Sequence, residues 1–226
     1  MPTALHISPP TVHRSGRAAS ADGAHARYQE TRTKALELFA RCGFSRVSMR
    51  DLADFLGIRA GSIYHHIESK EALLFELIEE LYENLLQGAL LLARRESSPA
   101  ARLPRLVEAH LQLHESMGAY FRLAEYDLHC LGSEHQARIQ SLRQRYETVL
   151  EVTLEQLTGE PACAVRRAAV AGIVSQLNQL PASVGDTPTD ARVRLELLRE
   201  MVMGSLRGVL LATRRVADPA TQAAGK

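Results

Sequence analysis

The chain has 226 residues, of which 46% are hydrophobic and 23% are charged, and its formal net charge at pH 7 is +1. This composition is typical of a globular protein with a sizeable core, and it excludes a strongly basic coat protein for nucleic acid. The longest apolar runs fall far short of the ~20 residues that a membrane-spanning helix needs, so we expect no membrane partner.

The charge is distributed unevenly along the chain. Residues 1–70 hold ten Lys and Arg against six Asp and Glu, a net +4, and residues 71–226 hold seventeen against twenty, a net −3. A basic front on a slightly acidic body is typical of a protein that binds DNA with one end. Residues 1–22, which contain three prolines and few large apolar side chains, are predicted to be a disordered tail. We leave open whether this tail is without function or is a basic arm that contacts DNA.

From Ala24 onward the pattern is helical throughout, which predicts an all-α fold of nine helices. Three helices form a head at 23–70 and six form a body at 71–226. The expected helices lie at about 24–42, 48–56, 60–66, 70–94, 101–117, 119–130, 134–158, 162–180 and 190–215. Glycine or proline marks most of the breaks between them.

The head has the local signals of a helix-turn-helix. Ser48 begins its second helix and Asp51 completes a capping box, while Gly57 permits a sharp turn before the third helix. Ser69 is expected to cap the fourth helix. Six residues have the spacing to form a shared core between the second and third helices: Leu52, Ala53, Leu56, Ile58, Ile63 and Ile67.

Burial of that core leaves a short polar surface pointing outward. Small residues at the start of the third helix would let its backbone enter the major groove, where Arg59 reaches guanine edges or a phosphate. The free amides at the N-termini of the second and fourth helices are suited to phosphate. The predicted DNA contacts are Ser48, Met49, Arg50, Arg59, Ala60, Gly61, Ser62, Tyr64, His65 and Lys70.

Residues 24–75 resemble the DNA-binding head of the TetR family of bacterial transcriptional regulators. The resemblance lies in the phrase LFARCGFSRVSMRDLADFLGIRAGSIYHHIESKEALL, with Ile67 where the family usually has phenylalanine and Met49 where threonine is common. It implies a homodimer that binds a palindromic DNA operator, usually as a repressor, and is released by a small-molecule effector bound in the body. A helix-turn-helix that serves only as a protein-binding adaptor is the alternative.

The resemblance also implies which part of the body forms the dimer. In this family the two C-terminal helices usually pair with those of a second copy, and here they carry the small and medium side chains that close packing needs. The alternative is that these faces belong to an ordinary core within one chain. We therefore predict a homodimer through the last two helices.

The effector pocket is expected between residues 75 and 180, and its apolar content favours a partly apolar ligand. The tract AYFRLAEYDLHCLGSEHQARIQSLRQRYETVL loosely resembles sensor domains of regulators of fatty-acid or steroid catabolism, some of which respond to acyl-CoA thioesters. In that case Arg122, Arg138, Arg143 and Arg145 are candidates to meet phosphate or carboxylate groups. The predicted lining residues are Leu106, His110, Leu113, His114, Met117, Tyr120, Phe121, Tyr126, His129 and Asn178.

Other kinds of function find less support in the sequence. It lacks a P-loop, a GxSxG, an HExxH and a glycine-rich dinucleotide motif, so we predict no enzyme activity and no cofactor. His110 and His114 lie one helical turn apart and leave a metal-responsive regulator open as an alternative. The cysteines Cys42, Cys130 and Cys163 are widely spaced, which favours free thiols in a reducing cytoplasm over a redox switch.

Overall fold

The computed structural model describes residues 16–64, 67–161, 163–184 and 190–217, and within them side chains from Ala26 to Ala212 except that of Ala60. This part of the chain is all-α, as predicted. The head comprises α1 (Gly16–Cys42), α2 (Met49–Leu56) and α3 (Ala60–Ile63). The body comprises α4 (Lys70–Arg95), α5 (Pro99–Tyr126), α6 (Ser133–Thr158), α7 (Ala164–Val184) and α8 (Ala191–Ala217). Two short 3-10 helices, η1 (Phe44–Arg46) and η2 (Leu128–Cys130), lie between them.

The predicted count of nine helices was wrong, since the described residues form eight α-helices. The segments expected at 101–117 and 119–130 are a single helix, α5, with a kink at Met117, where φ is −120° and ψ is 27°. The kink at Met117, next to Gly118, does not end the helix, because helical geometry resumes after this one non-helical residue. The end of the second predicted segment is the 3-10 helix η2.

Three helix boundaries also differ from the prediction. α1 begins at Gly16, so residues 16–22 are helical rather than tail, in keeping with their high alanine content; residues 1–15 lie outside the described residues. α3 ends at Ile63 instead of residue 66. α7 continues through Pro181 to Val184, since a proline in the last turn removes little of the hydrogen-bond ladder.

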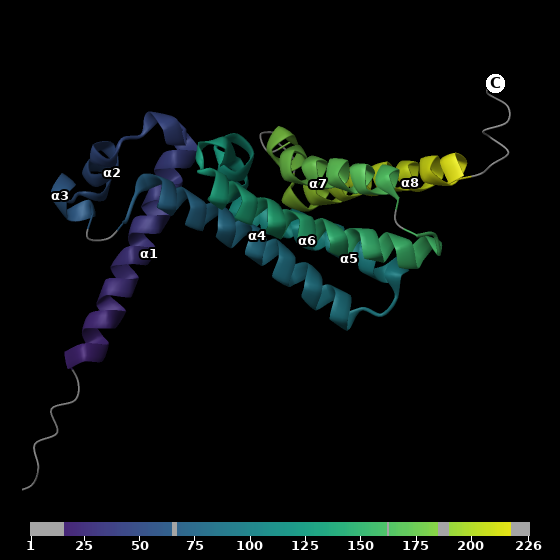
Figure 1. Cartoon of the computed structure of the whole chain (residues 1–226), viewed down its shortest axis with the longest axis horizontal. Coiled ribbons are helices and arrows are strands. Elements are labelled where there is room, and N and C mark those ends of the chain that lie inside the picture. Colours follow the sequence, from purple (N-terminus) through teal and green to yellow (C-terminus); the bar gives the residue numbers. More distant parts are fainter. Residues whose placement is uncertain (1–15, 65–66, 162, 185–189, 218–226) are drawn as a thin grey trace, which may run out of the picture.

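The helices are arranged as a head at one end of a layer of long helices, with α7 and α8 paired along the body (Figure 1). One hydrophobic core runs from the head into the body, and α4 passes through its centre. Leu74, Leu77, Ile78 and Leu81 of α4 are fully buried, and each stabilises the fold by roughly 1.5–3 kcal/mol. None of the helices among the described residues has the length and apolar run required to cross a bilayer.

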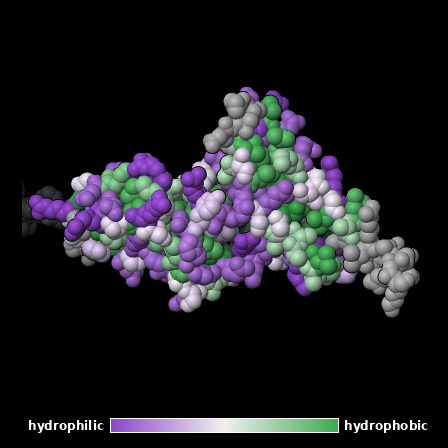
Figure 2. Space-filling view, turned by 90° about the horizontal axis from the view of Figure 1, so that it is seen from above, coloured by the Kyte–Doolittle hydropathy of each residue, from purple (hydrophilic) through white to green (hydrophobic). Residues whose placement is uncertain are grey.

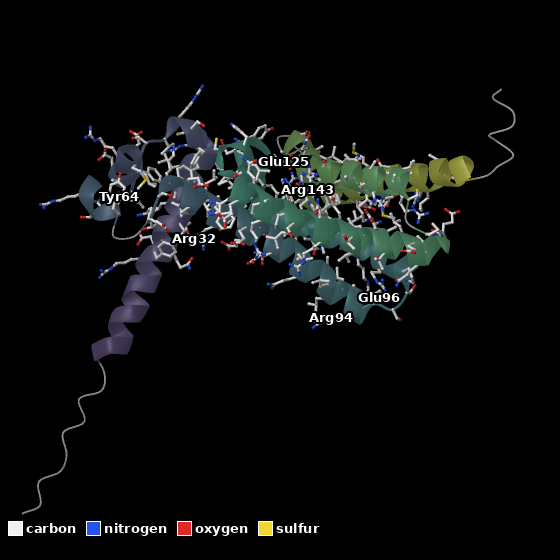
Figure 3. The ribbon with its side chains drawn as sticks, viewed as in Figure 1. Arg32, Tyr64, Arg94, Glu96, Glu125 and Arg143 are labelled. Carbon is white, nitrogen blue, oxygen red and sulfur yellow. The ribbon has the colours of Figure 1, made fainter. Side chains whose placement is uncertain are left out.

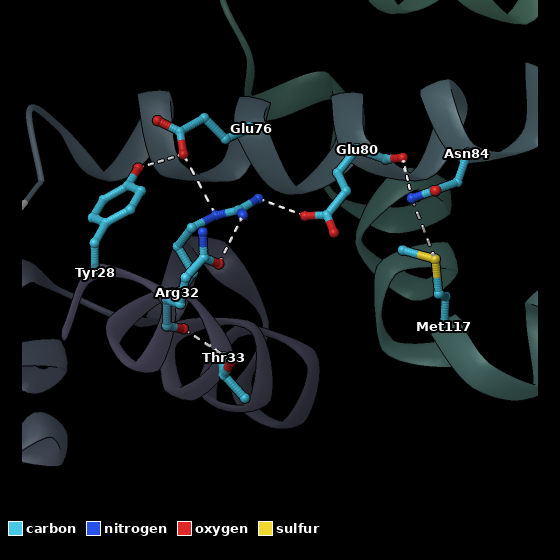
Figure 4. A network of polar contacts seen from close by, with 8 residues as sticks. Tyr28, Arg32, Thr33, Glu76, Glu80, Asn84 and Met117 are labelled. Carbon is cyan, nitrogen blue, oxygen red and sulfur yellow. Dashed lines mark hydrogen bonds and ion pairs between the residues drawn. The ribbon is translucent and has the colours of Figure 1, made fainter. Parts of the chain in front are cut away.

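Polar contacts join α1 to α4 above this core (Figure 4). The guanidinium of Arg32 lies 2.6 Å from the Glu80 carboxylate and 3.5 Å from that of Glu76. The Tyr28 hydroxyl donates a hydrogen bond to Glu76. Partial burial, together with Glu76, raises the pKa of Tyr28 to about 12. Because α1 also packs against α2, this cluster connects the head to the body.

A second joint lies at the first turn of α4. The Glu71 carboxylate accepts hydrogen bonds from the Gly132 amide (2.9 Å) and from His135 Nδ1 (2.7 Å) at the start of α6. These two donors, with the Gly132 amide as the larger cause, lower the pKa of Glu71. The His135 ring stacks on Phe75, with ring centroids 4.0 Å apart. The end of α4 nearest the head is therefore fixed to α6.

Candidate nucleic-acid interface and ligand cleft

The predicted capping box begins α2. The Asp51 amide donates to Ser48 Oγ (3.1 Å) and the Ser48 amide donates to Asp51 Oδ2 (2.8 Å). The Ser48 hydroxyl, as the largest cause, and the Ser48 amide lower the pKa of Asp51. The Ser48 hydroxyl also donates to Asp51, so this side chain is already used within the helix cap. The first-turn amides of Met49 and Arg50 have no carbonyl partner inside the helix, as in any α-helix.

The turn between α2 and α3 depends on Gly57, which adopts the left-handed conformation with φ 71° and ψ 27°. A side chain at this position would be strained, whereas glycine adopts it freely. The Ile58 amide donates to the Ala53 carbonyl (3.0 Å) and closes the end of α2. Arg59 is extended (φ −66°, ψ 139°) and begins α3. The backbone geometry of the turn therefore helps to set the direction of α3.

The predicted DNA contacts form an exposed surface around this turn. Arg50, Arg59 and Gly61 are exposed, Ser62 is half-buried, and the Tyr64 side chain is 62% exposed. Figure 3 shows Tyr64 in the head, at the opposite end of the molecule from α8. The structure describes only the backbone of Ala60, and His65 lies outside the described residues.

The same turn buries the predicted inner core. Leu52, Ala53 and Ile63 are fully buried, Ile67 is nearly so, and Leu56 and Ile58 pack against them as half-buried residues. Ile67 thus packs in this core at the position where the family that the head resembles usually has a phenylalanine. Met49 packs against this core, which leaves its side chain only partly available to DNA.

The predicted phosphate contact of Lys70 is its backbone amide. Its side chain makes hydrogen bonds to other parts of the protein. Its ammonium donates to the carbonyls of Phe44 (3.0 Å) and Val47 (2.7 Å) and lies 4.1 Å above the Phe44 ring. The side chain therefore holds η1 against the start of α4. The Ser69 hydroxyl accepts from the Ala72 amide and caps α4 as predicted.

A cleft of about 740 Å³ opens between α1, α5 and α7. Four of the ten predicted effector contacts line it: His114, Phe121, Tyr126 and Asn178. Arg122, a predicted contact for phosphate or carboxylate groups, also lines the cleft. The other lining residues were not predicted from the sequence: they are Glu37, Ala40, Arg41, Gly118, Ala119, Glu125, Gln179, Ala182 and Ser183. Its volume is within the range of about 300–1,000 Å³ that is usual for small-molecule sites.

Three more predicted contacts line a separate cavity of about 100 Å³ between α4, α5 and α6: Leu106, His110 and Leu113. His110 is fully buried, and its Nδ1 lies 2.9 Å from the Tyr146 hydroxyl. Burial, and next the neighbouring His114, lower the pKa of His110 to about 3, so its ring is neutral. This cavity has room for little more than a few waters or the end of a ligand.

Polar groups of α5 and α7 form a hydrogen-bonded chain along the larger cleft. The His114 ring, whose pKa is lowered by burial, lies with Nε2 3.0 Å from the Asn178 carbonyl. The Asn178 amide donates to Glu125 Oε1 (2.7 Å), and the Gln179 amide donates to Glu125 Oε2 (3.0 Å). Glu125 was missed by the sequence reasoning. Its position four residues after Phe121, on the same helical face, is the signal that points to it.

The remaining predicted effector contacts are not brought into either cavity. Met117 Sδ lies 3.9 Å from the Asn84 amide on α4. Tyr120 is half-buried, and burial, followed by the charge of Glu80, raises its pKa. His129 is exposed, next to Cys130.

Of the four candidate arginines, Arg122 lines the cleft. Arg138 is paired with two glutamates of α4, and Arg143 lies 2.9 Å from Glu147 and 3.0 Å from the Ser175 hydroxyl. Figure 3 labels Arg143 and Glu125 near each other in the body. Arg145 is exposed on α6.

The alternatives that rest on metal or thiol chemistry gain no support from the geometry. Both His110 and His114 are held by protein groups, and the described residues contain no cluster of three or more potential metal ligands. The three cysteines are free thiols, and Cys130 Sγ lies 3.3 Å from the Ser45 hydroxyl.

Large apolar side chains are exposed along α7 and α8. They are Val165, Val193, Leu197, Met201 and Leu211, with exposed fractions between 41% and 59%. On α8 they recur at helical spacing and so share one face. Figure 2 shows hydrophobic surface over this part of the molecule. A helix face with several exposed apolar side chains is typical of a protein–protein interface.

The helix-turn-helix surface on an all-α body defines a class of DNA-binding regulators, and two family models match the chain in the same arrangement. Residues 33–77 match the model for bacterial regulatory proteins of the tetR family, and residues 96–181 match that for the tetracyclin repressor-like C-terminal domain. The chain belongs to the TetR family of bacterial regulatory proteins.

Individual relatives agree with this assignment. The HTH-type transcriptional repressor KstR2 of Rhodococcus jostii is 38% identical over 63 residues, which are 28% of this chain and 31% of KstR2. The match thus spans about a third of the length of that relative. The crystal structure of the TetR family regulator PfmR from Thermus thermophilus is similar to this one, with a TM-score of 0.67. The two sequences are 26% identical, and the match covers 78% of this chain and 97% of PfmR.

A further solved structure is that of AibR in complex with isovaleryl coenzyme A and operator DNA. It is 19% identical, with a TM-score of 0.63 over 77% of this chain and 97% of AibR, and it shows similarity of fold alone.

Proposed function

We propose that this protein is a transcriptional repressor that binds a palindromic DNA operator as a homodimer and is released by a small, partly apolar effector. The observation that carries this proposal is the exposed surface at the start of α3. There a buried apolar core presents Arg59, Gly61, Ser62 and Tyr64 to solvent. Binding to a bacterial chromosome places the site of action in the cytoplasm.

The DNA contacts are testable by substitution on that surface. We expect Arg59→Ala and Tyr64→Ala each to weaken binding of a duplex selected from a random pool by about 1–3 kcal/mol. Glu115→Ala is a matched control, because Glu115 is exposed on α5, far along the chain from the head. Unchanged duplex binding by both head variants, measured by fluorescence anisotropy at fixed salt, would contradict the proposed surface.

The cleft between α1, α5 and α7 is the proposed effector site. KstR2 is named a repressor and AibR was solved with an acyl-CoA thioester and DNA, which supports an acyl-CoA or another lipid-like effector here. A ligand that binds only the folded protein raises its melting temperature by mass action. A thermal-shift screen of acyl-CoAs, fatty acids, steroids and metal salts tests this proposal. A response to metal salts alone would favour the metal-responsive alternative.

The dimer is proposed to form through the apolar surface of α7 and α8. A charge at its centre would remain buried and unpaired in the dimer, at a cost of several kcal/mol. We therefore expect Leu197→Glu and Met201→Glu to sediment as monomers. Val152→Glu, at a comparably exposed apolar residue of α6, is the control and should leave the dimer intact.

The alternative of a helical adaptor that binds protein alone predicts a different result. Such an adaptor would show no sequence preference among DNA duplexes, whereas a repressor enriches one sequence from a random pool.

A further inference from the structure

The ligand cleft is in direct contact with the helix that supports the head. Its α1 wall consists of Glu37, Ala40 and Arg41, in the last two turns of that helix. The same turns bury Leu38 and Phe39 in the head core. A molecule in the cleft therefore touches a helix whose opposite face supports the helix-turn-helix, without an intervening element.

Arg122 spans the cleft from α5 to this helix. Its Nη1 donates a hydrogen bond to the Ala40 carbonyl over 3.3 Å, a long contact between exposed groups. The Ala40 carbonyl lies in the last turn of α1, where carbonyls lack intrahelical partners and carry partial negative charge. A guanidinium has five donors in a planar fork that matches a carboxylate or phosphate. In the described residues, Arg122 uses one of these donors.

The other charged groups that line the cleft are Glu37, Arg41 and Glu125. Both oxygens of Glu125 already accept hydrogen bonds from the amides of Asn178 and Gln179. Arg41 adds a second guanidinium, which lies 5.4 Å from the centre of the Phe55 ring and 3.9 Å from the exposed Glu37 carboxylate one turn earlier on α1. An anionic group entering the cleft thus finds two guanidiniums and two carboxylates, those of Glu37 and Glu125, and both Glu125 oxygens are already occupied by amide donors.

The apolar part of the cleft lies next to these guanidiniums. Phe121 is buried at its floor, and the Tyr126 ring is 69% exposed at its edge. Gly118, Ala119 and Ala182 have small side chains or none, which creates the space between the helices. The cleft therefore matches a ligand with a flat or extended apolar body, which would contact the apolar part, and an acidic group at one end, which would contact the guanidiniums.

We propose that the cleft binds an amphipathic anion and that the acidic group of the ligand replaces the Ala40 carbonyl as the partner of Arg122. The inference rests on the cleft as the effector site of the proposed function, and it adds the ligand class and the route to the head. A bidentate, charge-assisted pair is stronger than the single long contact to a carbonyl. Ligand binding therefore releases the end of α1 from α5, and the head is no longer held in its DNA-binding position.

Two fluorescent probes of nearly equal shape test the ligand class. 1-Anilinonaphthalene-8-sulfonate carries a sulfonate, and N-phenyl-1-naphthylamine has the same rings without it. We expect saturable binding of the sulfonate to the full-length protein and about tenfold to a hundredfold weaker binding to Arg122→Met, as for loss of a charge-assisted contact. Binding of the neutral probe should be unchanged. Arg122→Lys should retain part of the sulfonate affinity, because it keeps the charge but loses the fork.

Two further variants locate the probe. Ala182→Trp fills the cleft and should weaken both probes, and Arg145→Met, which removes an exposed arginine of α6 outside the cleft lining, should weaken neither. Circular dichroism confirms that each variant is folded. Equal loss of both probes in Arg122→Met, no loss of either, or unchanged binding to Ala182→Trp would overturn the proposal.

The route to the head has its own readout. The sulfonate probe should weaken binding of the selected duplex to the wild type, and Arg122→Met, which lacks the contact that the probe displaces, should bind this duplex more weakly than the wild type even without the probe. Duplex binding by Arg122→Met that equals that of the wild type without the probe would overturn this route. If no duplex is selected at all, the proposed function fails, and the probe measurements still decide whether the cleft binds an amphipathic anion.

Discussion

Replacement of His110 by glutamine should remove a large part of the acid sensitivity of this fold. His110 is fully buried with its Nδ1 2.9 Å from the Tyr146 hydroxyl, and its pKa is lowered to about 3 by burial. In the unfolded chain the same ring titrates near its ordinary value of about 6.5. The unfolded state therefore takes up a proton that the folded state does not, and stability falls as the pH decreases from about 6.5 towards about 3.

The magnitude follows from the linkage relation. Each pH unit below the unfolded pKa costs about 1.4 kcal/mol, so at about pH 5 the cost for His110 is about 2 kcal/mol. The pKa of His114 is also lowered by burial and changes stability in the same direction, but His110→Gln leaves that contribution largely in place. Glutamine does not titrate, and it retains a polar group near the Tyr146 hydroxyl.

The assay is urea unfolding of the wild type and His110→Gln at about pH 7 and about pH 5, with protein concentration held constant because a dimer unfolds in a concentration-dependent way. The difference in free energy of unfolding between wild type and variant should fall by about 2 kcal/mol over this interval. A difference that does not change with pH would refute the assignment of His110 as a buried neutral ring.

Three further substitutions test the joints and the core. Lys70→Met removes two charged hydrogen bonds to backbone carbonyls of η1 and its flank, and it should lower the free energy of unfolding by about 2 kcal/mol in urea titrations, whereas Lys34→Met, at an exposed helix pair, should change it by less than about 0.5 kcal/mol. Leu77→Ala creates a cavity at a fully buried position of α4 and should cost about 2–5 kcal/mol, seen as a lower urea midpoint with an unchanged slope. Glu71→Gln keeps one acceptor for the two donors at the start of α6 and should lower the free energy of unfolding by about 1 kcal/mol. It should also speed amide hydrogen exchange at the start of α6, and unchanged exchange would show that this joint does not hold α6.

The local parts of the fold were predictable from the sequence. The capping box of Ser48 and Asp51, the left-handed Gly57 and the buried Leu52 and Ile63 all follow from residues within a few positions of one another. Such signals are encoded in backbone geometry and helical periodicity, so one sequence suffices to find them.

The kink and the cleft were less predictable, because they depend on contacts between distant segments. The sequence predicts separate helices at 101–117 and 119–130, but α5 continues through the kink at Met117. Arg122 was one of four equivalent candidates until the fold placed it next to Ala40, 82 residues earlier in the chain. Glu125 had no sequence signal beyond its helical face.

The most direct test of the account is competition between two duplexes of equal length, one selected from a random pool and one with the same bases scrambled. We predict that two chains bind each selected duplex and that they bind it at least about a thousandfold more tightly than the scrambled one at physiological salt. We further predict that Arg59→Ala reduces this ratio more than it reduces binding to the scrambled duplex. Equal affinity for the two duplexes would contradict the claim that the head reads DNA sequence.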